Sequence, residues 1–170
     1  MAGFFGGVHP GENKSWTCDQ AIEPLPAPSQ VVIPMSMHIG APCKPLVAKG
    51  DTVKVGQLIG DVDAFVSAPI HSSVSGTVTA IETQRNAMGG QDTLVVIAPD
   101  KKQDYDPTLR VPMVTDLAGF VKAVRDSGLV GLGGASFPTH IKYNPKNISE
   151  VHTLIVNGAE CEPFITSDHR

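Results

Sequence analysis

Cysteine is scarce in this chain of 170 residues, which has only three: Cys18, Cys43 and Cys161. They are widely separated and form no Cys-x-x-Cys pair, so the chain carries no self-contained zinc or iron–sulfur motif. We predict no signal peptide, because Met1–Gly7 has no positively charged side chain and no apolar segment follows it. An odd number of cysteines without a secretory signal favours reduced thiols in the cytoplasm.

Long apolar runs and an excess of positive charge are also missing. No run approaches the roughly 20 residues that cross a bilayer, so any link to a membrane must come through a partner. There are 13 lysines and arginines against 17 aspartates and glutamates, a formal net charge of −4, and no basic patch indicates nucleic acid. The 41% of hydrophobic residues suffices for a packed core in one domain or two small ones.

Short strands separated by glycine turns are predicted over residues 31–100. Val53 and Val55 alternate with polar residues, which is the period of a half-buried strand. The pattern occurs twice, and its spacing predicts a small two-sheet barrel or sandwich. The apolar segments of this pattern are 31–33, 52–55, 58–60, 65–69, 75–81 and 93–98.

The segments on either side of this region are predicted to be irregular. Residues 1–30 contain several prolines that favour extended geometry, and we expect this segment to lie over other parts of the protein, with Trp16 as an anchor. Residues 99–107 are polar and bounded by prolines, which is typical of a linker or exposed loop, and we place the domain boundary there.

An amphipathic helix is predicted over 116–127. Thr115–Asp116 can cap its start, and Gly128 is the expected stop. We expect its basic residues Lys122 and Arg125 on the solvated face. Its apolar face is formed by residues at helical spacing, namely Leu117, Phe120, Val121 and Val124.

A glycine-rich loop follows this helix, with Gly128, Gly131, Gly133 and Gly134 within seven positions. Glycine lets the backbone adopt positive φ and approach a ligand closely, and a glycine turn that enters a helix points several N–H groups at one place, which suits a phosphate. Pro138 fits the first turn of that helix and Lys142 adds a positive charge. The alternative is a mobile loop that only caps a helix.

A second cluster follows the apolar run 153–156, which is predicted to be a buried parallel strand. Ligands of open α/β sheets gather at the carboxyl ends of strands, so Asn157, Glu160 and Glu162 are placed to meet what the glycine loop holds. They would contact the sugar, amide or ring edges of a nucleotide. The alternative is a turn with solvated acidic residues.

In these motifs the chain resembles two families. Residues 131–142 followed by 157–163 resemble the FMN- and NADH-binding core of the complex I flavoprotein subunit. Val130–Gly134 and Gly158–Pro163 are still closer to the C subunit of the Rnf-type ion-translocating electron-transport complex. Other stretches that resemble that subunit are Gly7–Pro10, Glu12–Lys14, Ile33–Pro34 and His38–Pro42, so the similarity runs over nearly the whole chain.

A third resemblance concerns the fold of the β-rich region. Lys49–Gln57, Ala68–Pro69 and Ser75–Val78 resemble the barrel-sandwich hybrid of lipoyl and biotinyl carriers. A carrier needs a lysine at an exposed hairpin tip, but Gly60–Ser67 has none, so we interpret the domain as structural. His38 and His71 could face one another there, but no acidic or cysteine partner stands at a fixed spacing, and we favour hydrogen bonding over metal binding.

The expected fold is therefore α+β and multi-domain. An extended segment at 1–30 precedes a barrel-sandwich hybrid at 31–100, and 111–170 begins an α/β nucleotide-binding domain. The Rnf resemblance implies an electron-transfer subunit on the cytoplasmic side of the bacterial inner membrane, working with membrane-embedded and ferredoxin-reactive partner subunits. It implies FMN and NAD(H) in the full-length protein and two [4Fe-4S] clusters beyond residue 170. From the spacing of cysteine and histidine we expect no metal site within the chain.

Carried over residue by residue, the resemblance assigns cofactor-binding roles and no catalytic residue. Lys142 would meet the flavin phosphate, and Glu162 would lie nearest the nicotinamide. The chain departs from the complex I pattern at Ala159, where that pattern has Asp, and at Leu132, where it has Arg. The residues expected to bind cofactor are Gly131, Gly133, Gly134, Lys142, Asn157, Glu160 and Glu162.

These departures support an alternative, a non-catalytic structural subunit like the similar A subunit of the Na⁺-translocating NADH:quinone reductase. By comparison with the family, the sequence ends within its second domain, so we interpret it as an N-terminal fragment. We expect that fragment to be folded but inactive and empty of cofactor, because half of a nucleotide site recovers little of the cost of association.

Overall fold

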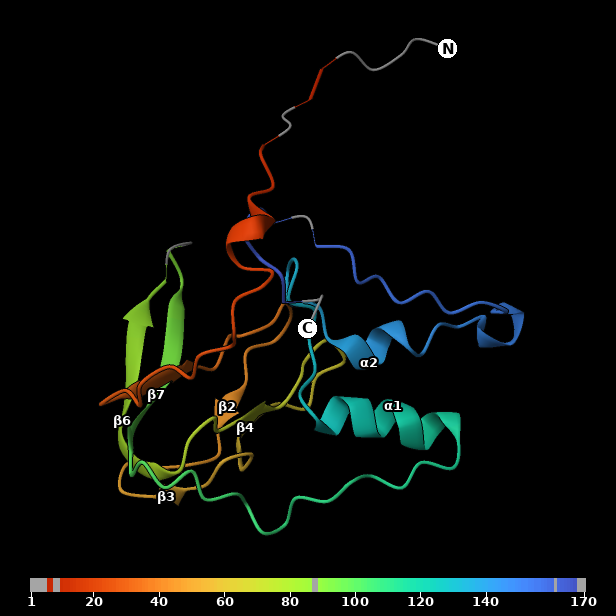
Figure 1. The fold of residues 1–170 in the computed structure, drawn as a ribbon. Helices are drawn as coiled ribbons and strands as arrows, with labels where there is room; N and C mark the ends of the chain where they lie inside the picture. Colours follow the sequence, from red (N-terminus) through yellow and green to blue (C-terminus); the bar gives the residue numbers. More distant parts are fainter. Residues whose placement is uncertain (1–5, 8–9, 87–88, 161, 168–170) are drawn as a thin grey trace. The chain divides into compact units, whose positions relative to one another are not determined.

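A computed structural model describes residues 6–7, 10–86, 89–160 and 162–167 (Figure 1). Of the motif residues above, Val8, His9, Cys161 and Arg170 lie outside these ranges. The chain folds into two compact units. One is Ala27–Ile148, and in the other Met1–Pro26 and Ser149–Arg170 come together.

The elements of regular structure are short apart from one hairpin and one helix. Among the described residues the longest helix has 10 residues, and none has the length and apolar character required to cross a bilayer. In chain order they are η1 Lys14–Trp16, β1 Val31–Pro34, β2 Lys44–Pro45, β3 Thr52–Val53, β4 Leu58–Asp61, β5 Ile70–His71, β6 Gly76–Arg85, β7 Gln91–Pro99, α1 Leu117–Asp126, α2 Thr139–Lys142 and η2 Ile148–Glu150.

Two antiparallel sheets form the body of the larger unit. One has the strand order β1-β7-β6-β3 and the other β2-β4-β5. The hairpin β6–β7, green in Figure 1, is the longest pairing. Strand β1 pairs with the other edge of β7, with Ile33 opposite Val95. The two sheets confirm the β-rich barrel or sandwich that the alternation predicts.

The core lies between these sheets. Val53, Val78, Val95 and Ile97 of the first sheet and Ile59 of the second are fully buried in one cluster. Each such side chain stabilises the fold by about 1.5–3 kcal/mol relative to its exposed state. Of the two alternating valines noted in the sequence, Val53 therefore belongs to this core, whereas Val55 is half-buried.

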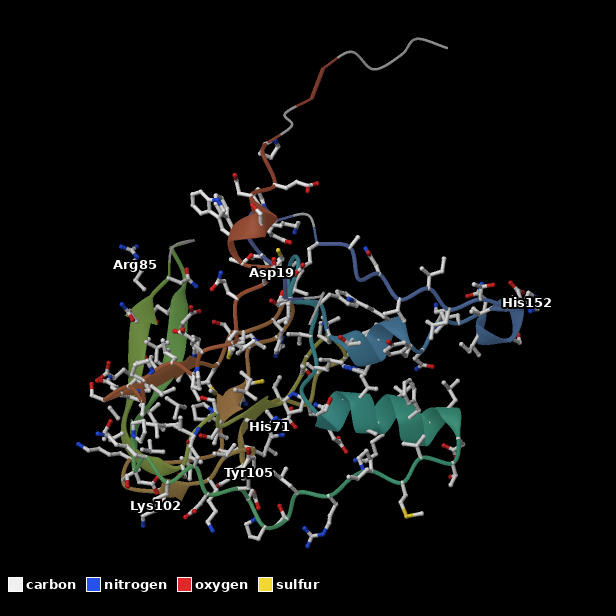
Figure 2. The ribbon with its side chains drawn as sticks, in the orientation of Figure 1. Asp19, His71, Arg85, Lys102, Tyr105 and His152 are labelled. Carbon is white, nitrogen blue, oxygen red and sulfur yellow. The ribbon has the colours of Figure 1, made fainter. Side chains whose placement is uncertain are left out.

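The polar segment after β7 lies against the barrel, although its composition predicts a linker. Val55 donates its N–H to the Asp104 carbonyl at 2.9 Å and accepts from the Asp106 N–H at 2.9 Å, so Val55 and Tyr105 form a parallel bridge. The Ser75 hydroxyl donates to Asp100 Oδ1 at 2.6 Å. Tyr105, labelled in Figure 2, stays exposed. Hydrogen bonding of the barrel thus continues beyond Pro99.

Helix α1 begins and ends as its sequence predicts. The Asp116 carboxylate accepts the Gly119 N–H at 2.7 Å, which is an N-cap. Gly128 follows the C-cap Ser127 with φ 71°, and its N–H donates to the Arg125 carbonyl at 2.8 Å. The ring of Phe120 packs edge-on against Tyr143, just after α2, at a centroid distance of 5.2 Å. The predicted second short helix is α2.

The predicted strand at 153–156 is wrong. Residues 151–160 have no regular secondary structure, and Leu154, Ile155 and Val156 are 72%, 83% and 82% exposed. A buried parallel strand needs neighbouring strands for its backbone hydrogen bonds and cover on both faces. The described part of the smaller unit contains no strand with which this run can pair, so its apolar character alone does not produce one.

Candidate cofactor site

The glycine loop is a closed turn in the larger unit. The Gly131 N–H donates to the Phe137 carbonyl at 3.0 Å, and the Thr139 N–H donates to the Leu129 carbonyl at 3.0 Å. Val130 and Pro138 form an antiparallel bridge between these bonds. The backbone is therefore fastened at the base of the loop, and residues 131–137 project as one connected turn.

Two predicted residues, Gly131 and Lys142, come together at this loop. A Cβ built on Gly131 would lie 3.1 Å from Lys142 Nζ, so the ammonium group rests against the loop backbone. A Cβ on Gly133 or Gly134 would meet no atom within 4 Å, and none of these three glycines has positive φ. The loop thus offers open backbone beside a cation, which fits a phosphate that approaches closely.

The helix after the loop is shorter than a strong anion site requires. Helix α2 has four residues, with Pro138 at its N-cap position and no side-chain cap. Four residues align few peptide dipoles, so a bound anion must be held by the loop N–H groups and Lys142 more than by the helix.

Arg125 does not lie on the solvated face of α1, contrary to expectation. Its guanidinium donates to Asp61 Oδ1 at 2.9 Å, to Asp61 Oδ2 at 3.4 Å and to the Val62 carbonyl at 3.2 Å. Both side chains of the ion pair are 28% exposed. The pair joins the barrel to the helix that leads into the glycine loop. Lys122, in contrast, is 74% exposed and pairs with Asp126, as expected.

The charge state of Asp61 follows from this contact. Partial burial alone would raise the pKa of its carboxyl, but the Arg125 hydrogen bond, the Val62 N–H and the Arg125 charge together lower it. Asp61 therefore stays ionised well below neutral pH. The sequence contained a signal for this role, because Arg125 follows Val121 by four residues and so lies on the same helical stripe.

His140, between the loop and Lys142, has an incompletely satisfied ring. Its Nδ1 is buried with no hydrogen-bond partner in the structure. It lines a groove of about 500 Å³ with Val121, Lys122 and Arg125. Burial and the Arg125 charge lower the pKa of His140, so the ring is neutral at pH 7. It adds no positive charge to the site.

His38 and His71 line one cavity of about 210 Å³ beside Gly128. His38 Nε2 accepts the Ala68 N–H at 3.2 Å and its Nδ1 lies 3.1 Å from the Ile39 carbonyl. His71, labelled in Figure 2, is half-buried, and burial lowers its pKa, partly offset by the charges of Asp61 and Asp126. His38 thus acts through hydrogen bonds, as expected, and His71 is a neutral ring at pH 7.

Cys43 lies against His38 in the barrel core. Its Sγ donates to the Ala68 carbonyl at 3.2 Å and lies 3.5 Å from His38 Nε2. Burial, and then the charge of Asp61, raise the pKa of this thiol to about 11, despite the opposing effect of Arg125. A neutral, hydrogen-bonded thiol is neither a nucleophile nor a metal ligand at pH 7.

The acidic half of the predicted site lies in the smaller unit. Asn157 Oδ1 accepts the Ala159 N–H at 3.0 Å, which makes a local turn. Glu160 Oε1 accepts the Ser167 hydroxyl at 2.9 Å, while Glu162 is exposed. Four of the seven predicted residues thus belong to one unit and three to the other. The described residues contain no group of three or more potential ligands that could hold a metal ion.

The comparisons with known proteins match the chain in two parts, whose limits differ from those of the two units. Residues 2–102 match the RnfC barrel sandwich hybrid domain. The chain belongs to the RnfC family. Its residues 124–170 also match the Nuo51 FMN-binding domain, and that range contains all seven predicted cofactor residues.

Several curated relatives of this RnfC-family chain are similar over almost all of it. The C subunit of the Na(+)-translocating ferredoxin:NAD(+) oxidoreductase complex of Acetobacterium woodii is 45% identical over 98% of the chain and 38% of the relative. The C subunit of the proton-translocating complex of Clostridium ljungdahlii is 43% identical over 100% of the chain and 38% of the relative. For the C subunit of the Rhodobacter capsulatus ion-translocating oxidoreductase complex, the values are 37%, 97% and 33%. The chain therefore spans little more than a third of these proteins.

Proposed function

We propose that this chain is part of the electron-transfer subunit of an ion-translocating ferredoxin:NAD oxidoreductase complex. The observation that carries the proposal is the glycine loop, where the Lys142 ammonium lies against Gly131 and the backbone at Gly133 and Gly134 is open, within the residues that match an FMN-binding domain. The longer protein would exchange electrons between NAD(H), flavin and two [4Fe-4S] clusters bound beyond residue 170.

FMN would supply the conversion of a hydride into single electrons, and the protein would fix its position. Loop N–H groups around Gly133 and Gly134 would hold the phosphate or ring, and Lys142 would neutralise the phosphate. Asn157 and Glu160 would contact the flavin through hydrogen bonds. Glu162 would lie nearest the nicotinamide of NADH.

The proposed assembly follows from the relatives, which are named as subunits of a complex. The protein would act at the cytoplasmic side of the bacterial inner membrane as a peripheral subunit. Its partners would be membrane-embedded and ferredoxin-reactive subunits. Residues 1–30, 31–100 and 111–170 would be its extended segment, its barrel domain and the beginning of its FMN- and NADH-binding domain.

The test is FMN titration of the full-length protein by flavin fluorescence, followed by NADH binding. Lys142→Met is expected to weaken FMN by roughly tenfold, the loss of about 1.4 kcal/mol from one charge-assisted contact. Lys146→Met, an exposed lysine four residues away, is the matched control and is expected to leave the affinity unchanged. Absence of FMN and NADH binding at tens of micromolar would refute the proposal.

The same titration on residues 1–170 tests how the site is divided. We expect this chain to bind FMN far more weakly than the full-length protein, because a few N–H groups and one lysine recover little of the association cost. Equal affinities would contradict that division. They would place the whole flavin site within these 170 residues.

A structural subunit, as in a Na⁺-translocating NADH:quinone reductase, is the second candidate. It is favoured by Leu132, which is 92% exposed on the glycine loop and presents an apolar side chain where complex I has Arg. Ala159 likewise lacks a polar group. A purified full-length protein that is colourless and fails to oxidise NADH with an artificial acceptor would favour this candidate.

A further inference from the structure

The N-terminal segment contacts the segment that follows Glu160, although more than 140 residues separate them in the sequence. Lys14 Nζ donates to the Ile165 carbonyl at 2.8 Å and to the Glu162 carbonyl at 3.2 Å. The same ammonium lies 3.9 Å from Glu160 Oε2. One lysine thus contacts three points along residues 160–165.

The ion pair between Lys14 and Glu160 is largely buried. The Glu160 side chain is only 9% exposed, and that of Lys14 is 27% exposed. A carboxylate removed from water needs charged and hydrogen-bonding partners, or its desolvation is uncompensated. The partners of Glu160 include the Lys14 ammonium and the Ser167 hydroxyl, so Lys14 contributes to the direction in which this side chain points.

Further contacts come from the residues beside Lys14. The Phe164 N–H donates to the Glu12 carbonyl at 2.9 Å, and the Thr17 hydroxyl donates to the Phe164 carbonyl at 2.5 Å. The ring of Trp16 meets Phe164 edge-on at 5.5 Å. Phe164 has φ 73°, in the left-handed region that bulky residues avoid, so its backbone conformation needs such support.

We infer that Lys14 is a positioning residue for the cofactor site, because it fixes the loop 160–166 that carries Glu160 and Glu162. This inference rests on the proposed function for its cofactor and on the contacts above for its mechanism. Lys14 acts through Glu160 and through the loop backbone. It also provides a physical reason for the Glu12–Lys14 motif, whose resemblance to the family had no explanation in the sequence.

The experiment compares Lys14→Met and Lys14→Arg with Lys49→Met in the full-length protein. Lys49 is an exposed lysine in a turn of the barrel, and its replacement removes the same charge elsewhere. Amide hydrogen exchange of residues 162–166 is measured without cofactor, and FMN affinity is measured by flavin fluorescence. Exchange of β6 and β7 amides reports whether the barrel remains folded.

Lys14→Met is expected to accelerate exchange in 162–166 and to raise the FMN Kd, each by roughly tenfold, while β6 and β7 stay protected. Lys14→Arg keeps the charge and several donors, so it is expected to restore both values to within about threefold of wild type. Lys49→Met should change neither value. Unchanged exchange, or faster exchange with unchanged FMN affinity, would overturn the inference.

A second variant decides the case if Lys14→Met also loses protection in the barrel. Thr17→Val keeps the side-chain shape and removes the hydroxyl that donates to the Phe164 carbonyl and also contacts the Lys14 carbonyl and the Thr166 hydroxyl. Exchange in 162–166 should therefore rise by about threefold. No change in Thr17→Val would then overturn the inference. Wild-type protein that binds no FMN would refute the proposed function separately, and exchange alone would then decide whether Lys14 holds the loop.

Discussion

Glycines in the barrel and glycines in the candidate site are required for different reasons. A Cβ on Gly76 would lie 2.2 Å from the Ala98 carbonyl oxygen, and one on Gly40 would lie 2.1 Å from that of Val66. In contrast, a Cβ on Gly133, Gly134 or Gly158 would meet no atom within 4 Å, and none of these residues has positive φ. Packing therefore explains the first group and leaves the second unexplained.

This difference separates glycines that the fold requires from glycines that the fold does not require. In the barrel, each of these small residues is accounted for by a neighbour within the protein. At Gly133 and Gly134 of the glycine loop, neither packing nor backbone conformation forbids a larger residue, and no described atom occupies the space beside them. The FMN proposed above would approach the backbone closely in that space.

The largest effect is expected for Gly76→Ala. The methyl group would collide with the backbone of the paired strand β7, which cannot yield without separating the strands. We expect the free energy of unfolding to fall by about 3 kcal/mol. Urea unfolding followed by circular dichroism measures this loss, and a stability equal to wild type would show that the β6–β7 pairing is looser than described.

Gly133→Ala is expected to leave the stability of the protein unchanged and to weaken FMN binding. Because the site is open, we expect the free energy of unfolding to change by less than about 0.5 kcal/mol. If FMN occupies that space in the full-length protein, its Kd should rise by roughly tenfold, about 1.4 kcal/mol. A variant that keeps full FMN affinity would show that the open face of the loop is not where the cofactor binds.

The sequence predicted the barrel well because its signals are local. Alternation at Val53 and near Val78 reports which residues face the core, and Asp116 and Gly128 mark the ends of α1 within a few residues of the helix. The run 153–156 carries an equally strong local signal but forms no strand, because a parallel strand depends on partners that a short run cannot provide.

The ion pairs also could not be predicted from local sequence signals. Lys14 and Glu160 are far apart in the sequence, and nothing near either residue indicates the other. Arg125 and Asp61 also lie in different predicted domains. Helical spacing places Arg125 on the apolar stripe of α1, but only the folded barrel determines which carboxylate it meets.

Asp61→Asn tests whether the barrel and α1 are held together by this pair. The folded-state pKa of Asp61 lies below its ordinary value of 3.8, so the ionised carboxylate adds stability above that pH, and this stability is lost as the pH falls through the folded-state pKa. We expect a loss of about 1 kcal/mol at pH 7 that shrinks toward pH 3. Asp63→Asn, at an exposed neighbour with no ion pair among those of the described residues, is the control.

The pH profile of the unfolding free energy is the measurement. Equal losses at pH 7 and pH 3 would mean that the Asp61→Asn variant is destabilised by the shape of the new amide and not by the missing charge. Loss of the Asp61 charge should also lower the pKa of His71 further, because that charge raises it against the effect of burial. Titration of His71 by NMR checks this second consequence.

The smallest effect is expected for Lys122→Met, three residues before Arg125 on the same helix. Its partner Asp126 is 50% exposed, so water and salt screen the pair, and such i,i+4 pairs contribute about 0.3–0.5 kcal/mol. Arg125→Met, in contrast, leaves Asp61 half-buried without its bidentate partner and should cost about 1 kcal/mol or more. Raising the salt concentration should abolish the Lys122 effect and leave most of the Arg125 effect. Equal losses in the two variants would show that the Arg125–Asp61 contact is an ordinary surface pair, and that the packing of Gly128 against the barrel holds α1 in place.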